Sequence, residues 1–241
     1  MTTPKRSRGT PSVPRAALTV SVEDYLKAIY DLERAGGAGA TNDIAARLTI
    51  APASVTGMVK RLAEQGLVHY TRYHGVTLTA AGRRAALLTI RRHRIIESYL
   101  TQVLGYEWDR VHDEAERLEH AASDELVNRM AAAIGEPDTD PHGAPIPTRE
   151  GTLTETRRRG LRALEIGVEA AVAGVNDRDP AVLRELGGLG IVPGARVTVA
   201  KVASRDGALT VRIRRGSATP SERTVRAPLA DAVYVDETID G

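Results

Sequence analysis

Side chains that can bind a divalent metal gather in the middle third of the chain. If the segment RVHDEAERLEHAASDELVNRM (110–130) is one helix, four such residues share an arc of about 100°, because successive residues turn by about 100°. These residues are His112, Glu116, Glu119 and His120. The two glutamates would repel each other on that face, and a divalent cation removes the repulsion by using the same lone pairs. The spacing predicts a metal site, with solvated side chains paired to Arg117 as the alternative.

A second pair of potential ligands precedes this segment. In RRHRIIES, His93 and Glu97 are four residues apart, so they share one face of a helix. We predict a long helix here, capped by Thr79 and running from Ala80 towards Leu100, with a break at LGYEWD before the next helix. Ordinary surface ion pairs with neighbouring arginines are the alternative explanation for this pair.

The residue types also exclude several kinds of chemistry. The 241 residues include no cysteine, which excludes disulfides, iron–sulfur clusters, cysteine-liganded zinc and thiol nucleophiles. Any bound metal must therefore be held by oxygen and nitrogen. The sequence has no H-E-x-x-H, G-x-S-x-G or P-loop motif, and Glu116–His120 lacks the first histidine of H-x-x-E-H. A metal-dependent hydrolase in which Glu116, Glu119 and His120 activate water stays open as an alternative, weakened by the lack of an obvious oxyanion donor.

Charge is segregated along the chain. Residues 1–92 carry 14 Lys and Arg against 6 Asp and Glu, residues 93–145 carry 4 against 12, and residues 146–241 carry 15 against 13. The basic first third favours a polyanionic partner, and the acidic middle third, which holds four of the six histidines, favours a cation. Two solvated faces of opposite sign would give the same counts.

The first third has the periodicity of three short helices. The first should begin at Ser21, where a capping-box-like start precedes apolar residues at helical spacing. TNDIAARL (41–48), capped by Thr41 or Asn42, predicts the second. TIAPASVTGMVKRLAEQGLV (49–68), with a proline in its first turn, predicts the third. The buried stripe of this third helix should consist of Val55, Met58, Val59 and Leu62.

A hairpin is expected directly after these helices. HYTRYHGVTLT (69–79) alternates around a His74-Gly75 turn, which predicts a β-hairpin wing. Helices joined by a tight connection and followed by a wing are typical of a winged helix-turn-helix, whose second motif helix enters the major groove of DNA. The residues expected near bases or phosphates are Ser54, Thr56, Lys60, Arg61 and the wing's Arg72. A helical interaction module with a solvated basic face is the alternative.

The C-terminal part changes period. After a segment rich in Pro, Gly, Thr and Arg, short apolar stretches are divided by Pro-Gly, Asp-Gly and Gly-Ser turns. DPAVLREL reads as one short helix among them. About five short strands around a small core predict a β-barrel.

These patterns predict a fold that is mainly α with a small β part. The expected segments are a disordered tail (1–16), a winged helix-turn-helix (17–79), a helical metal-binding domain (80–142), a linker (143–160) and a β-barrel (161–241). No apolar run reaches the ~18 residues needed to span a bilayer, and the basic N-terminus lacks the apolar stretch of a secretory signal. We therefore expect a cytoplasmic protein with no membrane partner.

Six segments together resemble one known family. EDYLKAIYDL, SVTGMVKRL, YTRYHGVTLTAAG, RRHRIIE, VHDEAERLEHAASDEL and DPHGAPIP are similar to the metal-dependent repressors, which include the diphtheria toxin repressor, the iron-dependent regulators and the manganese transport regulator. The similarity covers roughly residues 20–147, with a weaker C-terminal match to an SH3-like, FeoA-type barrel. It implies a homodimer, with residues 80–142 as its helical dimerisation domain, that binds palindromic operator DNA when a divalent metal is bound. It implies no small organic substrate. The barrel either supports the metal-bound state or only stabilises the chain.

The resemblance also implies a primary metal site. In the family this site joins one residue of the first helix to three of the helix containing VHDEA, and the matching positions are Asp24, Glu116, Glu119 and His120. Iron-sensing members have Met and Cys at the positions of Asp24 and Glu116, whereas manganese regulators have Asp and Glu. Because Mn²⁺ is hard and low in the Irving–Williams order, carboxylates with one imidazole avoid offering sulfur to stronger competitors. The resemblance favours Mn²⁺, with Fe²⁺ as the alternative, and Asp24 as a mere helix cap is the competing explanation for that residue.

A second site is implied as well. Some manganese regulators form a paired-metal site with a glutamate at the position of Lys27, and a cation cannot serve as that ligand. The ancillary site of iron-type members is matched instead by His93, Glu97 and His112, with a further ligand from the C-terminal domain, for which Asp177 is the candidate. The predicted function is a manganese-dependent transcriptional repressor of metal uptake genes, not an enzyme. An iron-dependent repressor, or a metal-independent winged-helix protein with an acidic dimer interface, are the alternatives.

Overall fold

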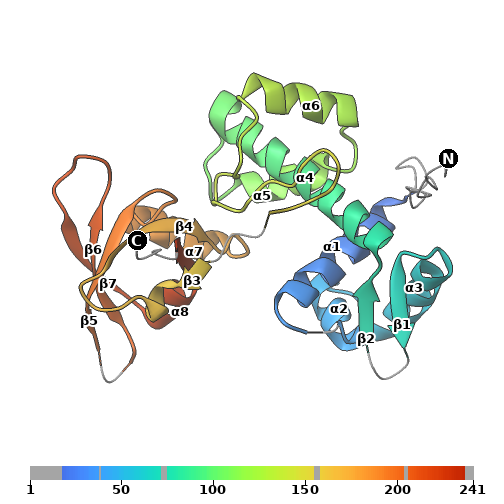
Figure 1. The fold of residues 1–241 in the computed structure, drawn as a ribbon, viewed down its shortest axis with the longest axis horizontal. Coiled ribbons are helices and arrows are strands. Elements are labelled where there is room, and N and C mark those ends of the chain that lie inside the picture. The colour runs from blue at the N-terminus through green and yellow to red at the C-terminus, as the bar shows by residue number, and fades with distance from the viewer. Residues whose placement is uncertain (1–17, 38, 72–74, 155–157, 204–205, 237–241) are drawn as a thin grey trace, which may run out of the picture. The chain divides into compact units, whose positions relative to one another are not determined.

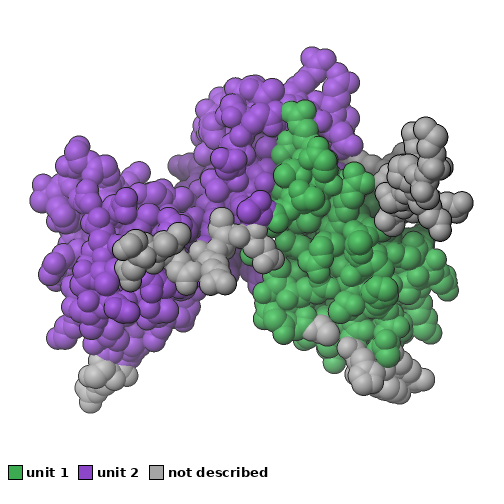
Figure 2. All heavy atoms as spheres, in the orientation of Figure 1, with its two compact units in different colours: residues 1–91, 147–153 green, residues 92–146, 154–241 purple. Residues whose placement is uncertain are grey.

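The computed structural model describes residues 18–37, 39–71, 75–154, 158–203 and 206–236. The chain divides into two compact units, Met1–Arg91 with Pro147–Leu153, and Arg92–Ile146 with Thr154–Gly241 (Figure 2). The predicted disordered tail and the wing turn with Arg72 and His74 lie outside the described residues.

The first unit consists of helices and a hairpin, as predicted. Its elements are α1 (Val20–Arg34), α2 (Thr41–Leu48), α3 (Pro52–Glu64), β1 (Val68–Thr71), β2 (Gly75–Leu78) and the first half of α4 (Ala80–Leu104) (Figure 1). β1 and β2 pair antiparallel, with Val68 opposite Leu78. The predicted stripe of α3 faces the core, with Met58 half-buried and the other three residues fully buried.

Two helix starts differ from the prediction. α1 begins one residue before Ser21, because Thr19 is its N-cap and accepts a hydrogen bond at Oγ1 from the Val22 backbone N (3.4 Å). Asp24 lies in the second turn of α1 and is therefore not the cap of that helix. The N-cap of α2 is Ala40, which has no capping side chain, so the predicted cap at Thr41 or Asn42 is wrong.

A segment from much later in the sequence completes the first unit. We call Pro147–Leu153 the return segment. Arg91 donates a hydrogen bond from Nη1 to the Pro147 carbonyl (2.9 Å), and Arg84 donates from Nε to the Glu150 carbonyl (2.8 Å). Leu153 packs against the apolar core of the unit. The DNA-binding fold predicted from the N-terminal residues thus includes a contribution from beyond residue 146.

The long helix α4 begins as predicted and extends further. Thr79 caps it, accepting a hydrogen bond at Oγ1 from the Gly82 backbone N (3.0 Å). The helix has 25 residues and ends at Leu104 rather than near Leu100. Within the described part of the chain, neither α4 nor any other helix is apolar over a length that could cross a membrane.

The helical part of the second unit corrects one prediction. Residues 110–130 form two helices, α5 (Val111–Leu118) and α6 (Asp124–Ala133), instead of one. Ser123 sets the start of α6, because its Oγ accepts a hydrogen bond from the Leu126 backbone N (3.2 Å). The two helices and the second half of α4 share a small core that consists of Ile95, Ile96, Leu100, Val111, Ala115, Ala122, Val127 and Ala131.

The C-terminal part of the second unit is a small β domain. Its elements are β3 (Arg158–Gly160), a short 3-10 helix (Leu161–Ala163), β4 (Glu169–Val175), α7 (Pro180–Leu189), β5 (Arg196–Val202), β6 (Leu209–Arg214), β7 (Ser221–Val225), α8 (Ala227–Asp231) and β8 (Val233–Asp236) (Figure 1). The strands form an antiparallel sheet in the order β3-β8-β4-β5-β6-β7. The predicted helix DPAVLREL is α7, capped by Asp179, whereas α8 was not predicted.

Candidate metal centre

Two predicted ligands of α4 lie one turn apart inside the second unit. His93 is 6% exposed and Glu97 is fully buried, and His93 Nε2 lies 2.9 Å from Glu97 Oε1. α5 brings His112 to the same place, with its Nδ1 3.1 Å from both of those atoms. The three side chains predicted as an ancillary group therefore form one cluster.

The other nitrogen of His93 faces the predicted primary ligands. His93 Nδ1 lies 2.6 Å from Glu119 Oε2 and 3.4 Å from Glu116 Oε2. His120 Nε2 lies 3.3 Å from Glu119 Oε1. Glu119 and His120 follow the last residue of α5, yet Glu119 still lies close to Glu116 and His93. His93 thus contacts both groups of candidate ligands.

The fourth predicted primary ligand belongs to the first unit. Asp24 lines a hollow of about 480 Å³ together with residues of α3, among them Ser54 and Arg61. Glu116, Glu119 and His120 belong to the second unit. The four-residue primary site therefore stays a prediction.

Two further residues, which were not among the predicted ligands, belong to this cluster. Asp140 and His142, from the loop after α6, each place a ligand atom within 4.8 Å of one on Glu97, and all three residues are buried. The signal was present in the sequence: His142 was the histidine of the acidic third left without a role, and Asp140 is two residues from it. Because the loop has no helical periodicity, the spacing of these two residues in the sequence did not predict where their side chains lie.

Hydrogen bonds orient both loop residues. The backbone N atoms of His142 and Ala144 each donate to Asp140 Oδ1 at 2.9 Å, which leaves Oδ2 for other contacts. The Trp108 carbonyl lies 2.7 Å from His142 Nε2. Since a carbonyl oxygen only accepts hydrogen bonds, Nε2 carries the proton and Nδ1 has the free lone pair.

Three buried atoms in this cluster have no hydrogen-bond partner among the described residues. They are Glu97 Oε2, Asp140 Oδ2 and His142 Nδ1. Glu97 Oε2 lies 3.9 Å from His142 Nδ1, and Arg94 Nε approaches Asp140 Oδ2 to 3.3 Å. Buried polar atoms are costly without a partner, and two carboxylate oxygens with one imidazole nitrogen suit a divalent cation. The residues fit a bound metal at this point.

The pKa values of these groups reflect their crowding. Burial alone would raise the pKa of Glu97, but the charges and hydrogen bonds of His93 and His112 lower it below its usual range. Burial, with the nearby charge of Glu97, raises the pKa of Asp140 to about 6. The hydrogen bond that His112 donates to Glu97 raises the pKa of His112. The cluster concentrates negative charge that a cation would offset.

Asp177, the predicted ligand from the C-terminal domain, lies within electrostatic reach of the cluster. Its charge contributes to the raised pKa values of both His112 and Asp140. It is half-buried and lies in the segment between β4 and α7. Its role as a ligand stays a prediction.

Four of the five predicted DNA-binding residues lie on α3. Ser54, Lys60 and Arg61 are exposed there, and Thr56 is half-buried. Arg72 lies outside the described residues. The exposed side of α3 therefore presents hydroxyl and basic groups, as expected of a helix that contacts DNA.

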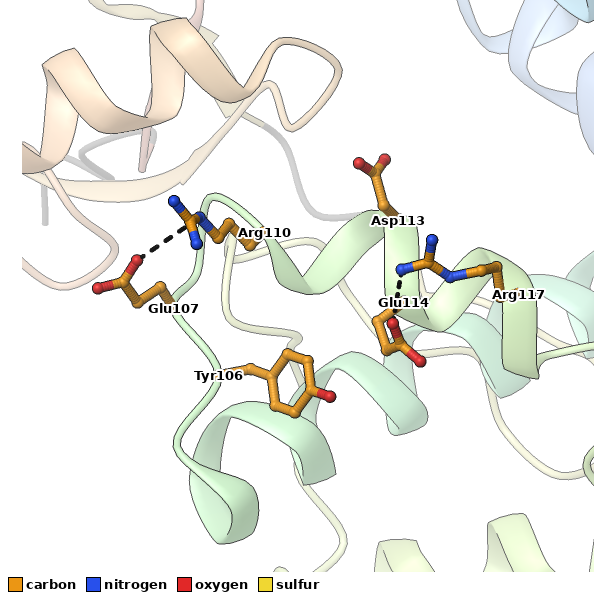
Figure 3. Close-up of a pocket in the computed structure, with 6 residues that line it drawn as sticks. All are labelled: Tyr106, Glu107, Arg110, Asp113, Glu114 and Arg117. Atoms are coloured by element: carbon orange, nitrogen blue, oxygen red, sulfur yellow. Dashed lines mark hydrogen bonds and ion pairs between the residues drawn. The ribbon is translucent and has the colours of Figure 1, made fainter.

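A separate open pocket lies on the outer side of α5. Its volume is about 620 Å³, and it is lined by Tyr106, Glu107, Arg110, Asp113, Glu114 and Arg117 (Figure 3). Arg110 Nε lies 3.8 Å from Glu107 Oε2, and Arg117 Nη2 donates to Glu114 Oε2 (2.6 Å). Four of the charged groups lining the pocket are thus already paired, and none of the clustered ligand residues lines it.

Three family models match consecutive parts of the chain. The iron dependent repressor N-terminal DNA binding domain matches residues 17–76, the iron dependent repressor metal binding and dimerisation domain matches residues 79–148, and the FeoA domain matches residues 159–237. The last match covers the β domain described above. The models agree in order and in content with the winged helix, the helical part and the sheet.

Individual proteins are similar over most of the chain. The iron-dependent repressor IdeR of Mycobacterium tuberculosis (strain ATCC 25618 / H37Rv) is 32% identical over 234 residues, which cover 91% of this chain and 98% of that protein. The diphtheria toxin repressor of Corynebacterium diphtheriae is 34% identical over 165 residues, 68% of each chain.

Solved structures are similar as well. A manganese-dependent transcriptional repressor in complex with manganese is 39% identical with a TM-score of 0.81, covering 90% of this chain and 99% of that one. The structure of ScaR with bound Cd²⁺ is 28% identical with a TM-score of 0.75 and the same coverage. Taken with the family models, these similarities show that the chain belongs to the iron-dependent repressor family of metal-dependent transcriptional repressors, whose members are DNA-binding proteins and not enzymes.

Proposed function

We propose that this protein is a manganese-responsive repressor that binds palindromic operator DNA as a homodimer and controls metal uptake genes. The assignment of manganese is supported by the kinds of atoms that could bind the metal. Two buried carboxylate oxygens and one imidazole nitrogen converge without hydrogen-bond partners among the described residues, and the chain has no cysteine. Oxygen and nitrogen donors suit Mn²⁺, and a similar solved repressor is described as a manganese complex.

Fe²⁺ is the second candidate metal. The same donors accept Fe²⁺, and similar curated proteins are named iron-dependent repressors. A response to Mn²⁺ at lower free concentration than to Fe²⁺ would support the manganese assignment, and the opposite order would replace it.

We assign two metal sites to each subunit. The first comprises Asp24, Glu116, Glu119 and His120. The second is built on Glu97, Asp140 and His142, with His93, His112 and Asp177 around it. When bound, a divalent ion supplies positive charge that draws these carboxylates and imidazoles together, which favours the arrangement of the chain that presents all of them.

The proposed regulation follows from where the first set of ligands lies. Asp24 belongs to the first unit and its three partners to the second, so binding to all four favours one arrangement of the two units. In a dimer, that arrangement would set the two α3 helices at the spacing of successive major grooves, roughly 34 Å. The coupling is reciprocal, so operator DNA tightens metal binding by the same factor, on the order of 5- to 150-fold.

A second copy of this chain is the proposed partner for an apolar surface of the helical part. The exposed apolar residues there are Val103, Leu104, Tyr106, Leu118 and Leu126, at the end of α4, in the loop after it, and on α5 and α6. They lie in the part that matches the dimerisation domain model. Large exposed apolar side chains gathered on one part of a soluble protein mark interaction surfaces.

The test is a DNA mobility shift with full-length protein. Duplexes are first selected from a genomic fragment pool in the presence of Mn²⁺, and binding is then measured across a Mn²⁺ titration. We expect Mn²⁺ to tighten binding and His120→Ala to abolish the effect. Glu125→Ala removes an exposed carboxylate of α6 instead and should behave as wild type. Equal DNA binding with and without metal would refute the proposed function.

A further inference from the structure

The loop between α4 and α5 carries the only tryptophan of the chain. Trp108 contacts the proposed metal ligand His142 in two ways. Its carbonyl oxygen accepts the His142 Nε2 hydrogen bond (2.7 Å), and its ring stacks on the imidazole with centroids 5.8 Å apart and planes at 27°. One residue therefore sets both the tautomer and the ring plane of His142.

The same indole also packs against the β domain. A Cβ atom added at Gly187 of α7 would lie 3.1 Å from Trp108 Nε1 and 3.2 Å from its Cζ2. The absence of a side chain at Gly187 thus allows the ring to lie close to the helix. Trp108 packs on the apolar core of the β domain, and the adjacent Asp109 pairs with Arg184 of α7 (3.5 Å).

We propose that Trp108 is a positioning residue for His142, and that α7 holds it in place through the space left at Gly187. The β domain thereby raises the metal affinity of the site formed by Glu97, Asp140 and His142. This inference rests on the proposed metal site. By reciprocity, metal binding strengthens the contact between Trp108 and α7 by the same factor.

The physical reason is that metal binding costs less free energy when the ligand His142 is already oriented. His142 can bind a metal through Nδ1 only while Nε2 keeps the proton, and the Trp108 carbonyl enforces that state. The stacked indole limits rotation of the imidazole, so less freedom is lost on binding. Outer partners of this kind change metal affinity by about 10- to 100-fold when they are removed.

Two neighbouring glycines of α7 give a matched pair of variants. Gly187→Val places a side chain against the indole, whereas Gly188→Val points into space with no atom within 4 Å of the added Cβ. Both changes are made in the same helix of the full-length protein. Mn²⁺ binding is measured by calorimetry, with His142→Ala used to identify the binding event of this site.

We expect Gly187→Val to weaken that binding event by about 10- to 100-fold and Gly188→Val to leave it unchanged. Trp108 fluorescence gives an independent readout, because a bound Mn²⁺ ion close to the indole alters its emission. The emission change should shift to higher Mn²⁺ concentration in Gly187→Val but not in Gly188→Val.

Trp108→Ala should also weaken binding. Trp108→Phe, which keeps a stacking ring, should retain most of the wild-type affinity.

The outcomes separate the two proposals. Equal affinities in the two glycine variants, or wild-type affinity in Trp108→Ala, would overturn the role of Trp108 and leave the metal site intact. If His142→Ala binds as many Mn²⁺ ions as wild type, the site itself is wrong, and the inference falls with it.

Discussion

At the scale of single residues, the candidate metal centre is distinguished by which of its atoms already have a hydrogen-bond partner. Glu97 illustrates this, because its two oxygens contact different groups. Oε1 lies within 3.1 Å of His93 and His112, whereas Oε2 is directed towards His142 at 3.9 Å and has no hydrogen-bond partner among the described residues. The carboxylate can therefore stay ordered without metal and still offer one oxygen to an ion.

Asp140→Asn should separate folding from metal binding. The amide oxygen of asparagine can still accept the backbone hydrogen bonds of His142 and Ala144, while the second oxygen is lost as a ligand. A ligand at 100 times its dissociation constant stabilises the folded state by about 2.7 kcal/mol. We expect Mn²⁺ to raise the thermal midpoint of the wild type clearly more than that of the variant. Identical shifts would remove Asp140 from the site.

Asp24→Met should change which metal activates the repressor. A thioether in place of a carboxylate favours softer ions, so the ~5- to 150-fold gain in DNA affinity expected with Mn²⁺ should fall and the response to Fe²⁺ should hold or rise. Anaerobic DNA-binding titrations with each metal measure the change. Ser21→Ala, a control on the same helix and lining the same hollow, should keep the preference of the wild type.

At the scale of elements, hydrophobic periodicity predicted the helices and strands well where local signals agreed. The hairpin, α3, the start of α4 and α7 are all set by caps, prolines and alternation near in sequence. The break between α5 and α6 was missed, because Ser123 looks equally acceptable within a helix until its capping bond is seen. Asp140 and His142 were missed because their place depends on tertiary packing of a loop.

That packing explains why spacing could not reveal the loop residues. The Val175 backbone N of β4 donates to the His142 carbonyl (2.9 Å), and Arg158 donates from Nη2 to the Gly143 carbonyl (2.6 Å). A Cβ at Gly143 would lie 2.3 Å from the Ala173 carbonyl, so only glycine allows this approach. The β domain, distant in sequence, therefore helps to position the loop that carries these two candidate ligands.

Gly82→Ala should destabilise the first unit, because it disturbs the packing of the start of α4 against the residue before β1. Its Cβ would lie 1.9 Å from the Leu67 carbonyl oxygen, so the helix start must move. We expect a loss of about 1 to 3 kcal/mol in the free energy of unfolding, measured with urea, despite the higher helix propensity of alanine. Gly57→Ala, in α3 with no atom near the added Cβ, should instead stabilise the protein by up to ~1 kcal/mol. Equal effects would contradict the steric argument.

At the scale of the whole molecule, the chain has three parts that match family models in this order: a DNA-binding domain, a helical metal-binding domain and an FeoA domain. The acidic charge of residues 93–145 coincides with the helical part that holds most of the candidate ligands. The basic first third coincides with the unit that carries α3. Charge segregation along the sequence thus corresponds to a division of roles in the fold.

Leu104→Asp should weaken the proposed dimer. Leu104 is 59% exposed at the end of α4, and burying a carboxylate there against a second copy costs about 2 kcal/mol or more if the residue is central to the interface. Sedimentation velocity should show a shift from dimer to monomer. Val202→Asp, at an exposed apolar residue of β5, should leave the dimer unchanged. A dimer that persists in Leu104→Asp would place the interface elsewhere.

The return segment has a consequence for synthesis of the protein. Arg91 donates a hydrogen bond to the Pro147 carbonyl, and Leu153 packs on the apolar core of the first unit. This unit therefore consists of two segments of the sequence, with the acidic helical part between them. We expect the N-terminal unit to complete its packing only after residue 153 has left the ribosome, because a nascent chain that ends before the return segment lacks part of that unit. The helical part that matches the metal binding and dimerisation domain model is therefore translated before the DNA-binding unit is complete.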